Sequence, residues 1–343
     1  MGFFDGLRRE KNAVGTINNQ HEDTTQQERA VSEVAQGASF EKVQPAPSSY
    51  RNEPEVVERA PRSQQTAEPE VAHPQLKSYA EKAPVTHVIG QTKIIAIINQ
   101  KGGVGKSTTA INLSAALGEL GRQVLLVDLD PQGNASSGLG IEKNLVKNCV
   151  YDVLINDVPV EQAIIPDVCQ GLDVLPATIN LAGAEVELVT EMARENRLKD
   201  ALGRLRGRYD FIFVDCPPSL GLLTVNALVA ADKLLIPIQC EFYALEGVTK
   251  LLDSMKRVKT RLNPALDIYG VLLTMYDGRT TLSKQVAEEV RSYFGRIVFN
   301  SMIPRTVKLS EAPSFGLPIT QYDPTGKGAQ SYVDLAKEVI ARG

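Results

Sequence analysis

The sequence predicts an α/β fold in which a mostly parallel β-sheet is covered by helices on both faces. Short apolar runs alternate along the chain with segments of helical periodicity, and this alternation is typical of βαβ units. The runs are continuously apolar, as expected for strands that a parallel sheet buries on both faces. The predicted strands are 94–98, 124–127, 172–175, 211–214, 234–238 and 269–274.

The first 90 residues differ in composition from the rest of the chain. They hold all three histidines and seven of the nineteen prolines. Residues 12–90 are rich in Gln, Glu, Ser, Pro and Ala and poor in large apolar side chains, a composition that cannot offset the entropy of folding. We therefore expect a disordered extension over 1–90 and a folded domain over 91–343. Residues 1–11 could form a short amphipathic segment that docks on a partner or a membrane, the alternative being a frayed terminus.

Charge and cysteine content restrict the class of protein. The net charge is −4, of which −3 falls in the first 90 residues, so the remainder is nearly neutral. This argues against a broad polybasic surface but allows a small basic patch. The four cysteines, at 149, 169, 216 and 240, are too far apart for a CxxC motif. No apolar run reaches the ~18 residues that span a bilayer, and we expect a cytoplasmic protein.

A glycine-containing loop follows the first predicted strand. It runs from Asn99 to Gly105, and a helix begins at Lys106 with apolar residues on one face. Free backbone N–H groups in such a loop and at the helix N-terminus bind phosphate. Lys106 would reach the β- and γ-phosphates, and the Ser107 hydroxyl would bind Mg²⁺. The segment therefore predicts an ATP site with Mg²⁺.

The loop departs from the common GxxxxGK[ST] pattern at its first position. That pattern places glycine at 100, where this chain has Gln100 followed by Lys101. A second lysine there cannot easily fold back onto the phosphates beside Lys106. It could instead reach the nucleotide of a neighbouring subunit, as an arginine finger does in trans. Hydrolysis would then depend on dimerisation.

Carboxylates end two other predicted strands. Asp128 and Asp130 follow strand 124–127 and point the same way in an extended chain. Asp130 could position the water that attacks the γ-phosphate, or it could simply cap a helix or form a turn. Asp215 ends strand 211–214, and an acid at a buried strand end is costly unless a cation such as Mg²⁺ neutralises it. The alternative for Asp215 is a solvated strand end. Together these residues predict an ATPase.

Five segments resemble the chromosome-partitioning ATPases called ParA or Soj. They follow one another in the family's order and cover nearly all of residues 91–343. The segments are 93–141, 211–228 (FIFVDCPPSLGLLTVNAL), 239–247 (QCEFYALEG), 270–280 (GVLLTMYDGRT) and 303–319 (IPRTVKLSEAPSFGLPI).

The resemblance implies a doubly wound P-loop NTPase fold and an ATP-dependent sandwich homodimer. It also implies non-specific DNA binding, association with the nucleoid, and hydrolysis stimulated by a ParB-like centromere-binding protein. In this reading Lys101 acts across the dimer, Asp130 is a switch residue needed for hydrolysis, and Asp215 belongs to the magnesium shell. The phosphate loop would consist of Gly102, Gly103, Val104, Gly105, Lys106, Ser107 and Thr108.

The resemblance also implies contacts to the nucleotide base and to DNA. Pro304 and Thr306, after a strand at 297–300, match positions that contact the base, although many members have Asn where Thr306 stands. Arg279 and Lys308 match DNA-binding positions, and Lys308 replaces a frequent arginine, which keeps the charge but not the bidentate geometry. A further cluster could add to this patch or be a solvated face: Lys256, Arg257, Lys259 and Arg261.

The main alternative is a MinD-like membrane-cycling ATPase, which shares the signature lysine. Such proteins end in a basic amphipathic helix that binds membranes. Here an apolar stripe precedes a short Ala-Arg-Gly end and favours a helix packed on its own domain; it consists of Tyr332, Leu335, Ala336, Val339 and Ile340. Only residues 1–11 keep membrane binding open.

Overall fold

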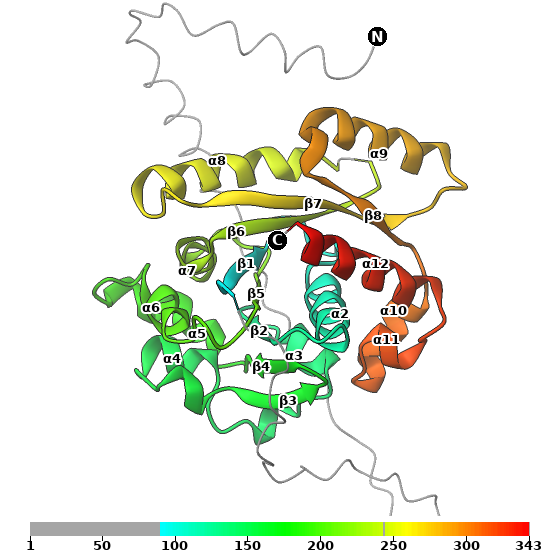
Figure 1. Ribbon diagram of the computed structural model, residues 1–343. Helices are drawn as coiled ribbons and strands as arrows, with labels where there is room; N and C mark the ends of the chain where they lie inside the picture. The colour runs from blue at the N-terminus through cyan, green and yellow to red at the C-terminus, as the bar shows by residue number, and fades with distance from the viewer. Residues whose placement is uncertain (1–89, 243, 343) are drawn as a thin grey trace, which may run out of the picture. The chain divides into compact units, whose positions relative to one another are not determined.

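The structure, a computed structural model, describes residues 90–242 and 244–342 (Figure 1). The predicted extension lies outside these residues apart from its last position, and so does the amphipathic segment over 1–11. The boundary near residue 90 therefore stays a prediction. Within the described part, no helix is long and apolar enough to cross a membrane.

One eight-stranded sheet forms the centre of the described domain. Its strand order is β3-β4-β2-β5-β1-β6-β7-β8, with β1 near the middle and the chain winding outward in both directions. Every neighbouring pair is parallel except β3 and β4. The doubly wound, mostly parallel sheet that was predicted is confirmed. The strands are β1 Lys93–Ile97, β2 Val124–Asp128, β3 Ile165–Cys169, β4 Leu172–Leu175, β5 Phe211–Asp215, β6 Lys233–Gln239, β7 Asp267–Tyr276 and β8 Val298–Pro304.

Two features of the sheet differ from the sequence expectation. Strand β3 was not predicted, because it is a half-buried edge strand containing Pro166 and lacks a continuous apolar run. It pairs antiparallel with β4. Strand β8 continues to Pro304, past the expected end at residue 300. The six strands predicted from apolar runs are all present, with ends that differ by at most two residues.

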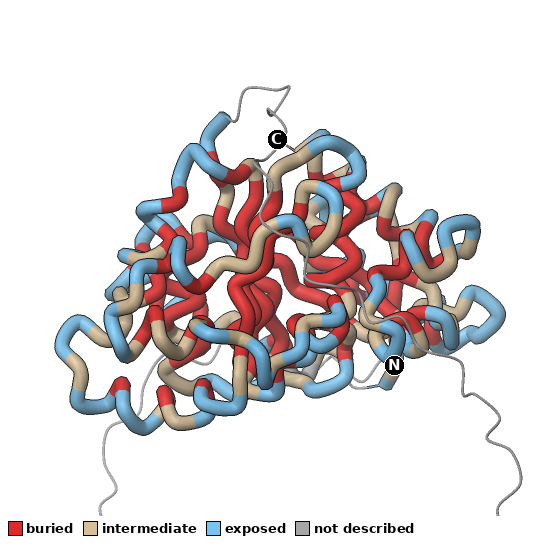
Figure 2. The backbone as a smooth tube through the Cα atoms, turned by 90° about the horizontal axis from the view of Figure 1, so that it is seen from below, coloured by how far each residue is buried: buried red, intermediate tan, exposed pale blue. Residues whose placement is uncertain are grey.

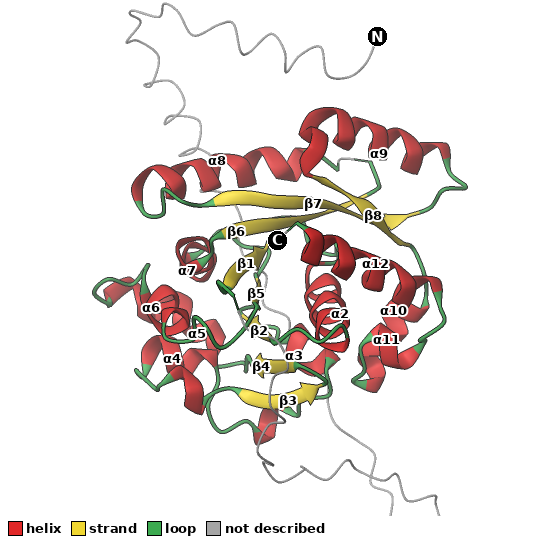
Figure 3. Ribbon diagram, in the orientation of Figure 1, coloured by secondary structure: helices red, strands yellow, loops and turns green. Residues whose placement is uncertain are grey.

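Helices cover both faces of the sheet (Figures 1 and 3). Apolar side chains on one face pack with α2, α3 and the helices after β8, and those on the other face pack with α4 to α9. The buried segments lie inside and the exposed ones outside, as Figure 2 shows. The helices are α2 Lys106–Glu119, α3 Asn134–Gly138, α4 Val150–Ile155, α5 Leu181–Glu187, α6 Arg197–Gly203, α7 Leu222–Ala230, α8 Glu246–Arg261, α9 Thr281–Phe294, α10 Lys308–Glu311, α11 Ile319–Tyr322 and α12 Lys327–Ala341.

The last helix, α12, packs on its own domain as the apolar stripe predicted. Tyr332 is buried against α2, and its hydroxyl lies 3.3 Å from the Thr109 hydroxyl. The Tyr269 hydroxyl donates to the Val339 carbonyl at 2.7 Å. Because its apolar face is already buried, α12 has no free stripe to insert into a bilayer.

Candidate nucleotide-binding site

The residues proposed for phosphate and magnesium binding come together at the carboxyl edge of the sheet. Strand β5 lies between β1 and β2, with Asp215 paired in register with Ile97 on one side and Asp128 on the other. Parallel neighbours end at the same edge, so the loops after all three strands meet there. This edge therefore holds the phosphate loop, Asp130 and Asp215.

The phosphate loop has the backbone that anion binding requires. Gly103 and Gly105 adopt left-handed conformations with φ of 74° and 88°, which favour glycine. Helix α2 starts directly after Gly105, and its first turn contains neither an acidic residue nor a side chain that caps it. The positive end of α2 is thus available to an anion.

Hydrogen bonds from two other strands hold the loop in place. The Asn99 amide donates to the Pro237 carbonyl at 2.7 Å, and its oxygen accepts from the Lys101 N–H at 3.0 Å. The Thr274 hydroxyl donates to the Val104 carbonyl at 2.8 Å. Both side chains are buried. Sequence reasoning missed these two roles, although an Asn that directly follows a buried strand is a usable signal.

The two lysines of the loop differ in their surroundings. Lys106 is 7% exposed, and its ammonium makes one long hydrogen bond of 3.5 Å, to the Lys101 carbonyl. No carboxylate of the described chain forms an ion pair with it, and a buried cation in that state suits a phosphate. Within the same residues the Lys101 ammonium, on a half-buried residue, has neither a hydrogen bond nor an ion pair.

The Asp215 carboxylate is buried, and among the described residues it has no ion pair and neither oxygen has a hydrogen bond of normal geometry, which fits a magnesium site. Burial, followed by the charge of Asp128, raises its pKa well above the ordinary value, and the nearby Ser107 hydroxyl and Lys106 ammonium oppose the rise. Carboxylate and hydroxyl oxygens are ligands that Mg²⁺ prefers. A cation here would relieve the cost of burying the charge.

The two acids after β2 have different roles. Asp128 accepts from the Ser136 N–H at 2.8 Å and the Ser136 hydroxyl at 2.7 Å, so it anchors the start of α3. Burial raises the pKa of Asp128 to about 6. The Asp130 carboxylate accepts from the Gln132 N–H at 3.0 Å. Asp130 therefore forms the turn that was its alternative role, and the turn places its carboxylate at the ligand edge.

A lysine from outside the predicted site supports the loop after Asp130. The Lys143 ammonium donates to the Gln132 carbonyl at 2.9 Å. Its side chain also lies beside Gly133, where a Cβ would come within 2.9 Å of the Lys143 Cδ and φ is 62°. The loop is thus fixed from inside by Asp130 and from outside by Lys143. Sequence reasoning missed Lys143.

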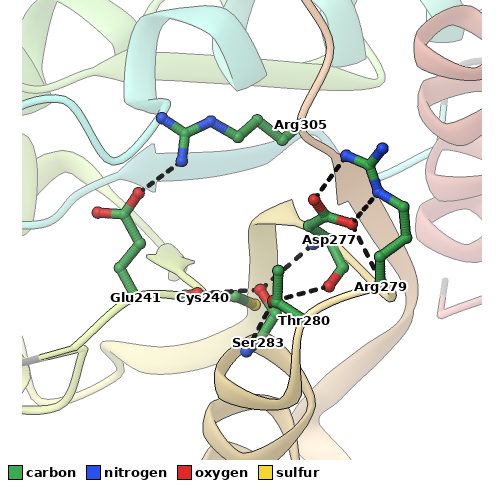
Figure 4. A network of polar contacts seen from close by, with 7 residues as sticks. All are labelled: Cys240, Glu241, Asp277, Arg279, Thr280, Ser283 and Arg305. Atoms are coloured by element: carbon green, nitrogen blue, oxygen red, sulfur yellow. Dashed lines mark hydrogen bonds and ion pairs between the residues drawn. The ribbon is translucent and has the colours of Figure 1, made fainter.

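The segment after β8 lies beside the ends of β6 and β7. Pro304 pairs with Tyr276, and the Thr306 hydroxyl accepts from the Lys308 N–H at 3.3 Å. The Arg305 guanidinium donates to Glu241, which follows β6, at 2.9 Å (Figure 4). Pro304 and Thr306 are placed at the ligand edge, and their contact to the base stays a prediction.

The two predicted DNA-binding cations are exposed, and each has an acidic partner. Arg279 donates through Nε and Nη2 to the two oxygens of Asp277, at 2.9 and 2.8 Å (Figure 4). The Lys308 ammonium lies 3.0 Å from a Glu311 oxygen. The cluster on α8 is also exposed. The sequence pattern gave no sign of these carboxylate partners.

The strand order, the glycine loop and the buried acid define a P-loop ATPase. A family model described as an AAA domain matches residues 92–268. The sporulation initiation inhibitor protein Soj of Bacillus subtilis is 59% identical over 251 residues, covering 73% of this chain and 99% of Soj. Chromosome partitioning protein ParA of Caulobacter vibrioides is 53% identical over 252 residues, covering 73% and 94%. The chain belongs to the ParA/Soj family of partitioning ATPases.

Solved structures agree with the fold and the cofactors. Cobyrinic acid a,c-diamide synthase from Mycobacterium smegmatis, with bound ATP analogue and magnesium, is 40% identical with a TM-score of 0.64. The similarity covers 73% of this chain and 94% of that one. The cell division ATPase MinD of Pyrococcus furiosus is 29% identical with a TM-score of 0.60, covering 73% and 99%. The protein is an ATPase that uses ATP and Mg²⁺.

Proposed function

We propose that the protein is an ATP-dependent dimerising switch that binds DNA non-specifically during chromosome or plasmid segregation. A ParB-like partner would stimulate its hydrolysis. The observation on which this rests most is the Lys101 ammonium, which no group in the described chain binds although it stands on the phosphate loop. A second subunit bringing its own nucleotide would give that ammonium a phosphate partner.

Each site residue would have a distinct task in hydrolysis. The N–H groups around Gly103 and Gly105 bind the phosphates, and Lys106 neutralises their charge. Asp215 and Ser107 would hold Mg²⁺, which would supply positive charge beside the phosphates during hydrolysis. Asp130 orients the attacking water. Lys101 of the second subunit completes the site, so that hydrolysis occurs only in the dimer.

DNA binding would use the exposed cations on the rim of the domain. Arg279 lies in the loop before α9, and Lys308 begins α10. Contacts to backbone phosphates need charge and no base-specific geometry, in keeping with non-specific binding. Association with the nucleoid would follow from this affinity. The exposed α8 cluster could extend the same surface.

The membrane-cycling alternative lacks an anchor in the described residues. Helix α12 has its apolar stripe buried against α2 and β7. Any membrane attachment would therefore depend on residues 1–11, outside the described structure. The similarity to chromosome partitioning protein ParA favours partitioning, and the MinD structure has a lower identity to this chain.

A co-sedimentation assay tests the proposal. We expect the protein to pellet with non-specific duplex DNA in ATP, but not in ADP or without nucleotide, and not with anionic lipid vesicles in any state. The double variant Arg279→Ala, Lys308→Ala should lose most ATP-dependent DNA binding and keep basal nucleotide binding. Unchanged DNA binding by that variant would show that Arg279 and Lys308 do not form the DNA-binding surface. ATP-dependent pelleting with vesicles would favour the membrane-cycling alternative.

A further inference from the structure

Both predicted DNA-binding cations are held by acids of their own chain. We propose that Asp277 and Glu311 compete with DNA phosphates for Arg279 and Lys308, and thereby limit the affinity of the protein for DNA. This inference rests on the proposed function. It assigns a regulatory role to two carboxylates, so that DNA must displace an intramolecular ion pair at each contact.

The Asp277 carboxylate is fixed by the backbone, independently of the arginine side chain. Its Oδ1 accepts from the Arg279 N–H at 3.0 Å, and its carbonyl accepts from the Thr280 N–H at 3.0 Å. The turn continues into α9, where the Thr280 hydroxyl accepts from the Ser283 N–H at 3.3 Å. The Ser283 hydroxyl donates to the Cys240 carbonyl at 3.1 Å, which ties the turn to the end of β6 (Figure 4). The acid therefore has a fixed position.

The cation of this pair is open to solvent. The Arg279 side chain is 90% exposed, whereas that of Asp277 is 23% exposed. The pair is bidentate, the geometry in which a guanidinium also binds phosphate. An exposed pair of this kind contributes little stability in water, so phosphate can replace the carboxylate. Asp277 then stays beside the incoming phosphate and repels it, because its backbone contacts do not change.

The Glu311 pair is a looser version of the same arrangement. One Glu311 oxygen lies 3.0 Å from the Lys308 ammonium and accepts from the Tyr322 hydroxyl at 3.1 Å. The ammonium also lies 5.3 Å from the centre of the Tyr322 ring. The tyrosine thus keeps the carboxylate near the lysine. Because Glu311 makes a single monodentate contact between flexible side chains, it should compete with DNA phosphates less than Asp277 does.

Other exposed cations show that such pairing is not general. In the part of the chain that the structure describes, Lys256, Arg257 and Arg261 on α8 form no ion pair. Lys259 lies 3.8 Å from Asp267, at the limit of an ion pair. Both positions assigned to DNA have a close carboxylate, as do the exposed Arg305 and Arg206, whereas most of the α8 cluster lacks one.

Charge-neutral variants test the inference. Asp277→Asn removes the charge and keeps an oxygen that accepts from the Arg279 N–H, so the turn should persist. Glu288→Gln is the matched control, because Glu288 is exposed on α9 and forms no ion pair among the described residues. We would measure the Kd for a fluorescent duplex in ATP by anisotropy over a salt series. Asp277→Asn should bind about two- to fivefold more tightly than the control, and Glu311→Gln about twofold.

The outcomes separate the inference from the proposed function. If Arg279→Ala weakens binding but Asp277→Asn matches Glu288→Gln, the inference is overturned while the proposed DNA surface stands. If Arg279→Ala leaves binding unchanged, the DNA surface itself is wrong. Combining Asp277→Asn with Arg279→Ala should abolish the gain over the control. A gain that persists without the arginine would show a general charge effect and contradict the pairwise competition. Equal melting temperatures of the variants confirm that the turn is intact.

Discussion

The phosphate loop and the rim of the domain, where Arg279 and Lys308 lie, both carry positive charge. The surroundings of that charge are opposite in the two regions. The ammonium of Lys106 is buried and has no acidic partner in the described part of the chain, and buried Asn99 and Thr274 hold its loop. The rim cations Arg279 and Lys308 are exposed, and each is paired with a carboxylate. The first region is built before its ligand arrives, whereas the second must exchange an internal partner for an external one.

This difference accounts for two kinds of affinity. A buried, unpaired charge gains much from a phosphate, because little solvent and no competing acid is displaced. An exposed, paired charge gains only the difference between two partners, and salt screens that difference. Nucleotide binding should therefore be strong and depend little on salt, and DNA binding weak and strongly salt-dependent.

The largest effect should come from Lys106→Ala. Because no other described cation shares its buried position in the loop, its removal should lower ATP hydrolysis by about 100-fold or more. Steady-state ATPase assays measure this, and Lys284→Ala, an exposed lysine on α9, is the control. Retention of more than a tenth of the rate would show that the buried ammonium is not the main charge at the phosphates.

Asp215→Asn and Asp128→Asn should separate a ligand-binding acid from a structural one. Among the described residues Asp215 has no hydrogen bond of normal geometry whereas Asp128 has three, so only Asp128→Asn should destabilise the nucleotide-free protein, by about 1–3 kcal/mol. Asp215→Asn should keep stability and lower Mg²⁺-dependent hydrolysis by about 100-fold. Chemical denaturation and a Mg²⁺ titration provide the readouts. A strongly destabilised Asp215→Asn would mean that this carboxylate supports the fold.

Thr274→Val should have a moderate effect confined to the phosphate loop. The change keeps the shape of the side chain but removes its hydrogen bond to the Val104 carbonyl, which then loses this partner. We expect an affinity for ATP about three- to tenfold lower, corresponding to about 1 kcal/mol for one hydrogen bond. Thr274→Ser, which retains the hydroxyl, should keep most of the wild-type affinity for ATP. Equal affinity for Val and Ser variants in calorimetry would argue against a pre-ordered loop.

Lys143→Met should give the smallest effect on the nucleotide side. Its contact to the Gln132 carbonyl is exposed, like the pairs of the rim, and solvent can replace it. We expect kcat to fall about two- to threefold with KM for ATP nearly unchanged, because the loop after Asp130 is loosened and the phosphate loop is not. Lys143→Arg should behave like the wild type. A large rise in KM would show that the loop after Asp130 also belongs to the pre-ordered nucleotide-binding region.

Local sequence patterns were sufficient to predict the centre of the fold and much of the site. Continuous apolar runs predicted six of the strands that pair in parallel, and the glycines before Lys106 predicted the strand-loop-helix unit. Strand β3 was not predicted, because a half-buried antiparallel edge strand has no continuous apolar run. The packing of α12 was predicted because its stripe recurs with helical period.

The supporting contacts could not be predicted, because they join distant parts of the chain. Thr274 lies 170 residues from Val104, and Asn99 lies 138 residues from Pro237. No local pattern indicates such pairs. Asp277 lies only two residues from Arg279, but only the geometry of the turn shows that it binds the guanidinium. The different roles of Asp128 and Asp130 likewise depend on Ser136 and the turn.

A mixing experiment tests most directly whether Lys101 acts in a second subunit. Lys101→Ala has an intact pocket but cannot supply the lysine, whereas Asp130→Ala supplies the lysine but has an inactive pocket. Each variant alone should hydrolyse ATP poorly. An equal mixture should recover about a quarter of the wild-type rate, because half of the dimers then contain one complete site of two. A mixture no more active than the average of its components would contradict the shared site and the dimeric switch built on it.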